Sequence, residues 1–161
     1  WDVYDADRCP TGRLHRRAEP MGEGEFHLVV YAWIRGGDGR YLLTKRSPNK
    51  GYPNMWECTG GSALAGDDSL TAALREVREE TGVRLNPMRG RCVASHKVTG
   101  RFEDVWLFER DVALDELTLQ EGETCGAMLA RADEILELQR EGRMAPTGSF
   151  ELAELLRLME G

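Results

Sequence analysis

The sequence has few cysteines, and none of them are closely spaced. The chain of 161 residues contains no CxxC pair. Zinc sites of the finger type and redox dithiols need closely spaced cysteines, so the spacing argues against both classes of site. We expect the thiols to be reduced and packed in the core or near the surface. The cysteines are Cys9, Cys58, Cys92 and Cys125.

The sequence also lacks a long apolar segment and an excess of basic residues. No apolar run approaches the roughly 20 residues that span a bilayer. The first residues lack the basic start and apolar middle of a secretory signal. We therefore expect a cytoplasmic protein with no membrane partner. The formal net charge of −7 argues against binding to a nucleic acid polymer, because such binding needs a basic face.

The remaining composition is typical of a globular domain. Apolar residues make up 41% of the chain and charged residues 30%, as in ordinary soluble domains. There are no repeats, low-complexity tracts or changes in composition along the chain. We expect residues 1–161 to form one domain.

Apolar patterns predict a mixture of strands and helices. The glycine-rich turn at 36–39 lies between the first two strands and predicts a hairpin. Helices are expected between Asp67 and Gly82, over about 132–140 and over 150–159. Because strands and helices do not strictly alternate, the prediction is an α/β fold of the α+β type, with a mixed β-sheet sandwiched between helices. The expected strands are 26–34, 41–44, 91–98, 105–112 and 125–130, with a short element at 56–61.

The first predicted helix carries three carboxylates on one face. At about 100° per residue, Glu76, Glu79 and Glu80 lie close together. Like charges at this spacing weaken an isolated helix, whereas a hard divalent cation would bind them, because Mg²⁺ prefers oxygen ligands. The alternative is a solvated acidic face, which this stretch alone does not exclude. We expect Glu80 to lie beside the apolar face of the helix and not within it.

A longer pattern surrounds these carboxylates. It follows G-x5-E-x7-R-E-U-x-E-E-x-G-U, where U is a bulky aliphatic residue, at eight of its nine defined positions. The departure is Asp67, where the pattern has Glu. This pattern resembles the Nudix box, and nine spaced positions are a specific signal. The matching chain positions are Gly61, Asp67, Arg75, Glu76, Val77, Glu79, Glu80, Gly82 and Val83.

The resemblance implies a role for each polar residue of the box. A Nudix box forms a loop, a helix and a loop that hold Mg²⁺ or Mn²⁺. Carried over by motif, the metal ligands are Glu76, Glu79, Glu80 and the backbone carbonyl of Gly60. Arg75 orients Glu79, and their i, i+4 spacing also favours an ion pair.

The resemblance covers roughly residues 1–137 and points to one branch of the family. The segments WDVYDADR, TGRLHRR, FHLVVYAWI and LLTKRSPNKGYPNMWE look like type 1 isopentenyl-diphosphate isomerases and the hydrolases related to them. By this resemblance Arg46 and Lys50 hold the substrate diphosphate, and Arg16 falls near the place of a third basic contact. Guanidinium and ammonium groups suit phosphate oxygens. An ordinary basic loop is the alternative for Arg46 and Lys50.

The isomerase activity itself is the alternative function. The catalytic cysteine of that branch would stand at position 60, where this chain has Gly60, and Cys58 lies two positions too early. The isomerase box also loses acidic residues at the places of Glu76 and Glu79, which are present here. We therefore interpret the chain as a hydrolase.

A second acidic segment precedes the strand at 125–130. The resemblance implies that a Glu in this region is a further metal ligand or the general base, and the spacing favours Glu123 over Glu121. A solvated acidic loop is the alternative. Either Glu79 or Glu123 is then the catalytic general base.

The prediction is a Mg²⁺-dependent hydrolase that cleaves a diphosphate (pyrophosphate) bond in a small molecule, such as a nucleoside diphosphate linked to another moiety. One to three metal ions would neutralise the diphosphate and lower the pKa of a bound water, whose proton the general base accepts. The substrate identity stays open, because specificity lies in loops. We also allow for a homodimer. A binding module is disfavoured, because such a module has no reason to keep mutually repelling carboxylates.

Overall fold

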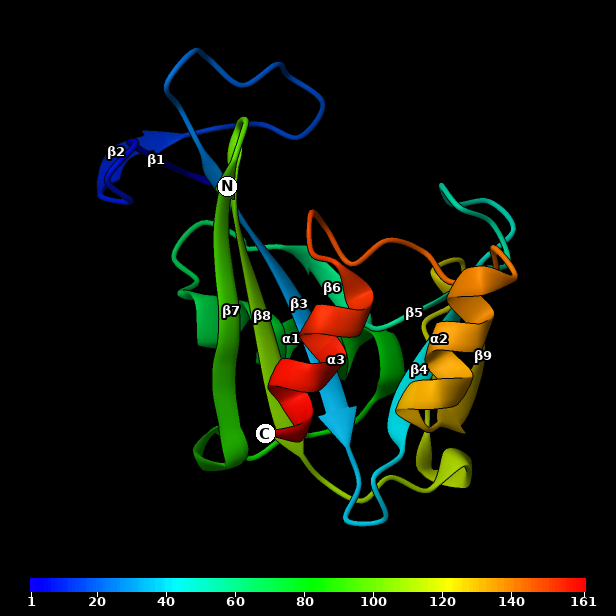
Figure 1. The fold of residues 1–161 in the computed structure, drawn as a ribbon. Coiled ribbons are helices and arrows are strands. Elements are labelled where there is room, and N and C mark those ends of the chain that lie inside the picture. Colours follow the sequence, from blue (N-terminus) through cyan, green and yellow to red (C-terminus); the bar gives the residue numbers. More distant parts are fainter.

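A computed structural model describes all residues from 1 to 161 (Figure 1). The strands are β1 Asp2–Tyr4, β2 Pro10–Leu14, β3 His27–Arg35, β4 Tyr41–Arg46, β5 Trp56–Glu57, β6 Thr59–Ser62, β7 Gly90–Val98, β8 Arg101–Glu109 and β9 Thr124–Ala130. The α-helices are α1 Ser69–Thr81, α2 Ala132–Arg140 and α3 Leu152–Glu160. No helix combines the length and the hydropathy that crossing a bilayer requires.

The main sheet is mixed and is centred on β3. Strand β3 runs parallel to β8 along its whole length and antiparallel to β6. The predicted hairpin of β3 and β4 is joined in register only at Arg35 and Tyr41. Beyond this turn β4 diverges and pairs with β5 and β9 instead. The two strands therefore separate toward the end of the sheet where Arg46 lies.

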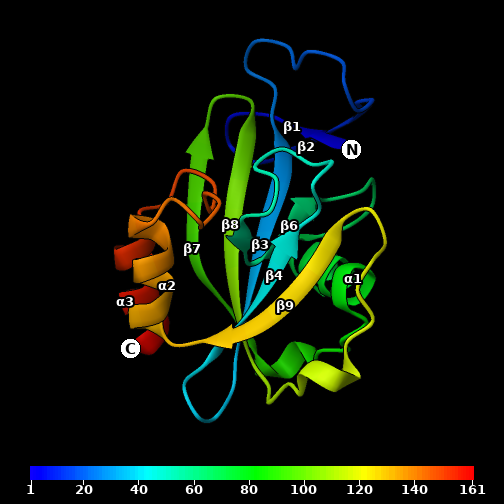
Figure 2. The ribbon, with the colours of Figure 1, turned by 90° about the vertical axis from the view of Figure 1, so that its right-hand side faces the viewer.

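Helices cover both faces of this sheet, as predicted (Figure 2). Alternate side chains of β3 point to opposite faces, as the pleat of a strand requires. Val30 and Ala32 belong to the buried cluster that includes Ala73 and Val77 of α1. Trp33 belongs to the other cluster, which includes residues of α2 and α3. The α+β fold expected from the sequence is confirmed.

Local signals set both ends of α1. The side chain of Asp68 accepts a hydrogen bond from the backbone N–H of Thr71 at 2.7 Å and so caps the first turn. The helix ends at Gly82, whose φ of 75° is left-handed. Glycine adopts this conformation at no steric cost. The helix that carries the predicted metal ligands is therefore fixed by its own sequence at both ends.

One predicted strand has different bounds in the structure, and one pair of strands was not predicted. The strand predicted over 105–112 is β8, which begins and ends earlier. Its first half contains the charged residues Arg101, Glu103 and Asp104, which resemble a loop in sequence but are satisfied by partners inside the fold. The N-terminal pair β1 and β2 was not expected. Strand β2 is exposed along its whole length. It therefore has no buried face and no alternation of apolar residues that would indicate a strand in the sequence.

Asp104 joins three parts of the chain to β8. Only 2% of this residue is exposed. Its carboxylate accepts hydrogen bonds from Arg8 Nη1 at 2.8 Å, Ser69 Oγ at 2.5 Å and Ser95 Oγ at 2.6 Å. Burial raises the pKa of Asp104, but these hydrogen bonds outweigh it, and the net pKa is below the ordinary value. The start of α1 is thereby tied to the sheet, since Trp106 Nε1 also donates to Ser69 Oγ at 2.8 Å.

Asp104→Asn is expected to destabilise the protein by about 2 to 3 kcal/mol, because it leaves three donors without their charged acceptor. The melting temperature should then fall by roughly 5–10 °C. The Asp104 pKa is lowered by folding, so its contribution is present at neutral pH and is lost as the pH falls below about 4. Thermal melts at pH 7, with the exposed Asp115→Asn as control, test this. Equal melting temperatures for the two variants would contradict it.

Candidate active site

One pocket of about 720 Å³ gathers most of the predicted site residues. Its walls come from the end of β4 and the loop after it, from β6, from α1 and from the loop before β9. These segments are far apart in sequence and meet where β3 and β4 separate. The predicted residues in the pocket are Arg46, Lys50, Gly60, Arg75, Glu76, Glu79, Glu80 and Glu123.

Arg75 is the central cation of this pocket. Its Nη1 lies 2.9 Å from Glu76 Oε1 and 3.2 Å from Glu79 Oε2, the i, i+4 partner expected from the sequence. Its Nε donates to Asp67 at 2.9 Å and its Nη2 donates to the Ser62 carbonyl at 3.1 Å. Asp67 thus reaches Arg75 although the box usually has Glu there. Arg75 holds the loop before α1 and two predicted metal ligands in one arrangement.

Gly61 makes room for the carboxylate of Glu76. A Cβ atom at position 61 would lie 2.5 Å from Glu76 Cδ, so the carboxylate of Glu76 would have to move. A glycine here therefore allows the close approach of carboxylate and backbone. Burial raises the pKa of Glu76, and the neighbouring Arg75 opposes this effect.

Glu80 is deeply buried, contrary to the expectation that it lies beside the apolar face. Only 4% of the residue is exposed, and it belongs to the buried face of α1 with Ala73 and Val77. The loop before β9 covers this end of α1, where Gln120 N donates to the Glu80 carbonyl at 3.0 Å. The Oε2 atom of Glu80 has no hydrogen-bond partner. Burial and, to a smaller extent, the negative charge of Glu57 raise the pKa of Glu80 to about 8.

The residues present fit a hard divalent cation. The pocket offers four carboxylates, those of Glu76, Glu79, Glu80 and Glu123, and carboxylate oxygens are ligands that Mg²⁺ and Mn²⁺ accept. The unpartnered, buried Oε2 of Glu80 is an atom that a bound cation would satisfy. No group of three or more His, Cys, Asp or Glu side chains has the arrangement of a metal site in this structure. Glu76 and Glu79 form ion pairs with Arg75, and Glu123 forms one with Lys50, so these basic groups compete with a cation for the carboxylates.

The basic residues of the pocket are paired with its acidic residues. Lys50 Nζ lies 2.5 Å from Glu123 Oε2. Arg46 donates to Glu57 from Nη1 and to the Gly51 carbonyl from Nε at 2.5 Å. The third predicted contact, Arg16, does not line the pocket, and its neighbour Arg17 does. The segment around Arg16 is irregular, so a shift of one residue decides which side chain faces the pocket.

Three residues of this region were not predicted as site residues. Arg17 and Trp1 line the pocket, and Trp1 stacks on His27 with ring centroids 4.3 Å apart. Glu57 lies on β5, outside the box, and only 13% of its side chain is exposed. The signal that could have found Glu57 is its position in a short strand next to the Gly60-Gly61 turn, where few charged residues can be buried without a function.

Cys58 and Gly60 do not provide a thiol at this site. Cys58 is 4% exposed, burial raises its pKa, and its Sγ lies 3.9 Å from Thr147 Oγ1. A Cβ atom at position 60 would lie 2.8 Å from the Val30 carbonyl oxygen. The backbone therefore excludes a cysteine at position 60 unless β3 and β6 shift apart.

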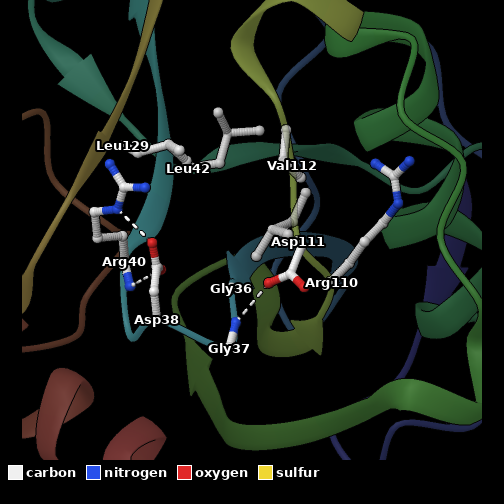
Figure 3. Close-up of a pocket in the computed structure, with 10 residues that line it drawn as sticks. Gly36, Gly37, Asp38, Arg40, Leu42, Arg110, Asp111, Val112 and Leu129 are labelled. Carbon is white, nitrogen blue, oxygen red and sulfur yellow. Dashed lines mark hydrogen bonds and ion pairs between the residues drawn. The ribbon is translucent and has the colours of Figure 1, made fainter.

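A second pocket lies at the other end of β4, around the turn that follows β3 (Figure 3). Each of its charged side chains has a hydrogen-bond or ion-pair partner. Arg40 Nε donates to Asp38 at 2.7 Å, and Asp111 accepts a hydrogen bond from Gly37 N at 2.7 Å. Arg110 is paired with Glu116 at 2.9 Å. None of the residues predicted to bind metal or diphosphate lines this pocket.

Known proteins are similar to this chain over most of its length. A family model described as the NUDIX domain matches residues 25–149. An uncharacterized Nudix hydrolase of Listeria monocytogenes is 37% identical over 148 residues, which cover 91% of this chain and 88% of the relative. An isopentenyl-diphosphate delta-isomerase of Shigella flexneri is 26% identical, covering 96% and 78%. A crystal structure of a Deinococcus radiodurans protein covers 97% of this chain and 96% of its own, with a TM-score of 0.74 and 25% identity.

Proposed function

This chain belongs to the Nudix family and is a Nudix hydrolase family enzyme. On that premise we propose that it hydrolyses a diphosphate bond in a small molecule and depends on Mg²⁺ or Mn²⁺. The observation that carries the proposal is one pocket that contains the box carboxylates, Arg46 and Lys50 together. Acidic residues for a metal and basic residues for a diphosphate are what this reaction needs. We further propose that residues 1–161 form a single domain, and a homodimer stays a prediction.

Each side chain then has a role. Glu76, Glu79, Glu80 and the Gly60 carbonyl would hold the metal, which when bound supplies charge neutralisation and a more acidic water. Glu79 or Glu123 accepts the proton of the attacking water. Both are suited to this role because their side chains are 48% and 43% exposed and reach the open part of the pocket.

Arg46 and Lys50 would bind the diphosphate. Their present partners are Glu57 and Glu123. A bound cation would compete with these basic groups for the carboxylates and release them toward the substrate phosphates. Arg17, which lines the pocket, takes the place that the sequence assigned to Arg16.

A separate, smaller pocket is available for the group attached to the diphosphate. A smaller pocket of about 300 Å³ shares Arg46 and Gly60 with the first and is lined by Tyr31, Tyr52 and Pro146. Aromatic side chains provide flat apolar surface for a ring. We propose a ring-bearing organic group, as in a nucleoside diphosphate derivative, in this pocket.

A screen of diphosphate compounds tests the proposed function. Phosphate or monophosphate release is measured over nucleoside triphosphates, dinucleotides, nucleotide sugars and prenyl diphosphates, with and without Mg²⁺. Metal-dependent cleavage of at least one class is expected. No cleavage of any compound by a folded, metal-loaded protein would contradict the proposal.

The isomerase is the second candidate, favoured by the identity to isopentenyl-diphosphate isomerases over most of the chain. We expect no conversion of isopentenyl diphosphate to dimethylallyl diphosphate, because position 60 carries no thiol and has no room for one. NMR of the reaction mixture, with product separation by chromatography, measures this. Detection of the allylic isomer would reverse the ranking of the two functions.

A further inference from the structure

Glu57 carries a buried oxygen that its partner Arg46 leaves unsatisfied. The residue lies on β5, in register with Thr44 of β4. Its Oε2 accepts a hydrogen bond from Arg46, whereas its Oε1 is buried and has no partner. A carboxylate can accept about four hydrogen bonds, so the contact with Arg46 uses only part of this capacity. An oxygen buried in this way is unfavourable unless another group satisfies it.

Glu80 carries a second oxygen of the same kind. The residue is 4% exposed, and its Oε2 is buried without a partner. Glu80 lines the main pocket together with Arg46, Gly60 and Gly61, and Glu57 lines the adjoining pocket, which shares these three residues. The two carboxylates therefore border the same Gly60-Gly61 turn, although they come from β5 and α1.

Only one positive side chain touches this pair directly. Arg46 contacts Glu57, while Lys50 is paired with Glu123 and Arg75 with other residues of the box. If Glu57 served only to hold Arg46, its second oxygen would gain nothing from being buried. Two buried carboxylates with free oxygens are the arrangement that a hard cation stabilises.

We propose that Glu57 is a further carboxylate of the metal site, in which its unpartnered oxygen and that of Glu80 are satisfied by a shared divalent cation. This inference rests on the proposed function, because it adds a residue to the same site. It also gives Arg46 two tasks. Arg46 neutralises Glu57 in the metal-free protein, and it becomes free to bind a phosphate when the cation takes over that carboxylate.

Binding of Mn²⁺ to the chain of residues 1–161, prepared without metal, tests the proposal without any turnover. The fraction of free Mn²⁺ is followed by electron paramagnetic resonance during a titration. Glu57→Gln is expected to weaken Mn²⁺ binding on the order of tenfold or more or to remove one equivalent. The matched control Glu121→Gln, which removes an exposed carboxylate of the loop before β9, should bind Mn²⁺ as the unmodified chain does.

Two more variants separate the explanations. Arg46→Met removes the partner of Glu57 but keeps the carboxylate, so Mn²⁺ should bind at least as tightly as before. If Glu57 acts only through Arg46, this variant and Glu57→Gln should weaken Mn²⁺ binding equally, and the proposal is overturned. Glu80→Gln serves as the reference for the metal site. Loss of Mn²⁺ in Glu80→Gln with unchanged binding in Glu57→Gln overturns the inference alone, whereas unchanged binding in both overturns the proposed metal site as well.

A folding defect would not hide the result. Melting curves without metal show whether Glu57→Gln is folded. Glu57→Asp keeps the charge but shortens the side chain, and it is expected to bind Mn²⁺ more tightly than Glu57→Gln and less tightly than the unmodified chain. Equal Mn²⁺ affinity for Asp and Gln at position 57 would contradict a direct contact with the cation.

Discussion

Chelation of divalent metal is expected to abolish turnover of the diphosphate substrate, and Mg²⁺ or Mn²⁺ is expected to restore it. The pocket contains four carboxylates of the predicted set, and its basic residues Arg46, Lys50 and Arg75 are each paired with acidic side chains. Without a cation, the negative diphosphate meets negative side chains and a water with its ordinary high pKa. Charge stabilisation and water activation would both be missing, and these provide most of the rate in such reactions.

The measurement is product release in excess EDTA, followed by titration with Mg²⁺ or Mn²⁺. The metal-free protein should remain folded, because the apolar clusters on both faces of the sheet do not include the site. A circular dichroism spectrum in EDTA serves as the control for folding. Full turnover in excess chelator would refute the metal mechanism.

The substitution Glu80→Gln is expected to lower kcat by roughly two orders of magnitude or more. Glutamine has nearly the same volume as glutamate, but a neutral amide is a poorer ligand for a hard cation. Glu80 is the most deeply buried carboxylate of the box, and its free Oε2 has no other partner to replace a cation. Steady-state kinetics at saturating Mg²⁺ measures the effect, with Glu121→Gln as the matched control. A folded variant with near-normal kcat would mean that the carboxylates of α1 are only an acidic face.

The same substitution is expected to raise the melting temperature of the metal-free protein. Folding raises the pKa of Glu80 to about 8, mainly through burial, from an ordinary value of about 4.3. A raised carboxylate pKa means that the native state binds more protons than the unfolded state, so stability falls as the pH rises between these two values. The difference between Glu80→Gln and the unmodified chain should therefore widen from pH 5 to pH 8. Thermal melts of both proteins in EDTA over this pH range measure the difference in melting temperature. A difference that does not change with pH would contradict a raised pKa for Glu80 in the native state.

Much of this protein was determined by local sequence. Asp68 and Gly82 cap α1 through hydrogen bonds and a φ angle that involve only near neighbours. The spacing of Arg75 and Glu79 places them within ion-pair distance on any α-helix. Such features follow from helical geometry alone, so the amino-acid sequence by itself determined the helix, the box and the family.

The tertiary structure decided which polar groups are buried and which of them meet. Glu80 lies next to Glu79 in sequence, yet it is covered by the loop before β9, whose position depends on the pairing of β9 with β4. Glu57 contacts Arg46 because β5 pairs with β4, which leaves β3 after a single registered pair. Asp104 is satisfied by donors from three distant segments. The periodicity of apolar residues describes one helix or strand at a time. Burial and charge pairing depend on the order of strands in the sheet, which no single segment of the sequence determines.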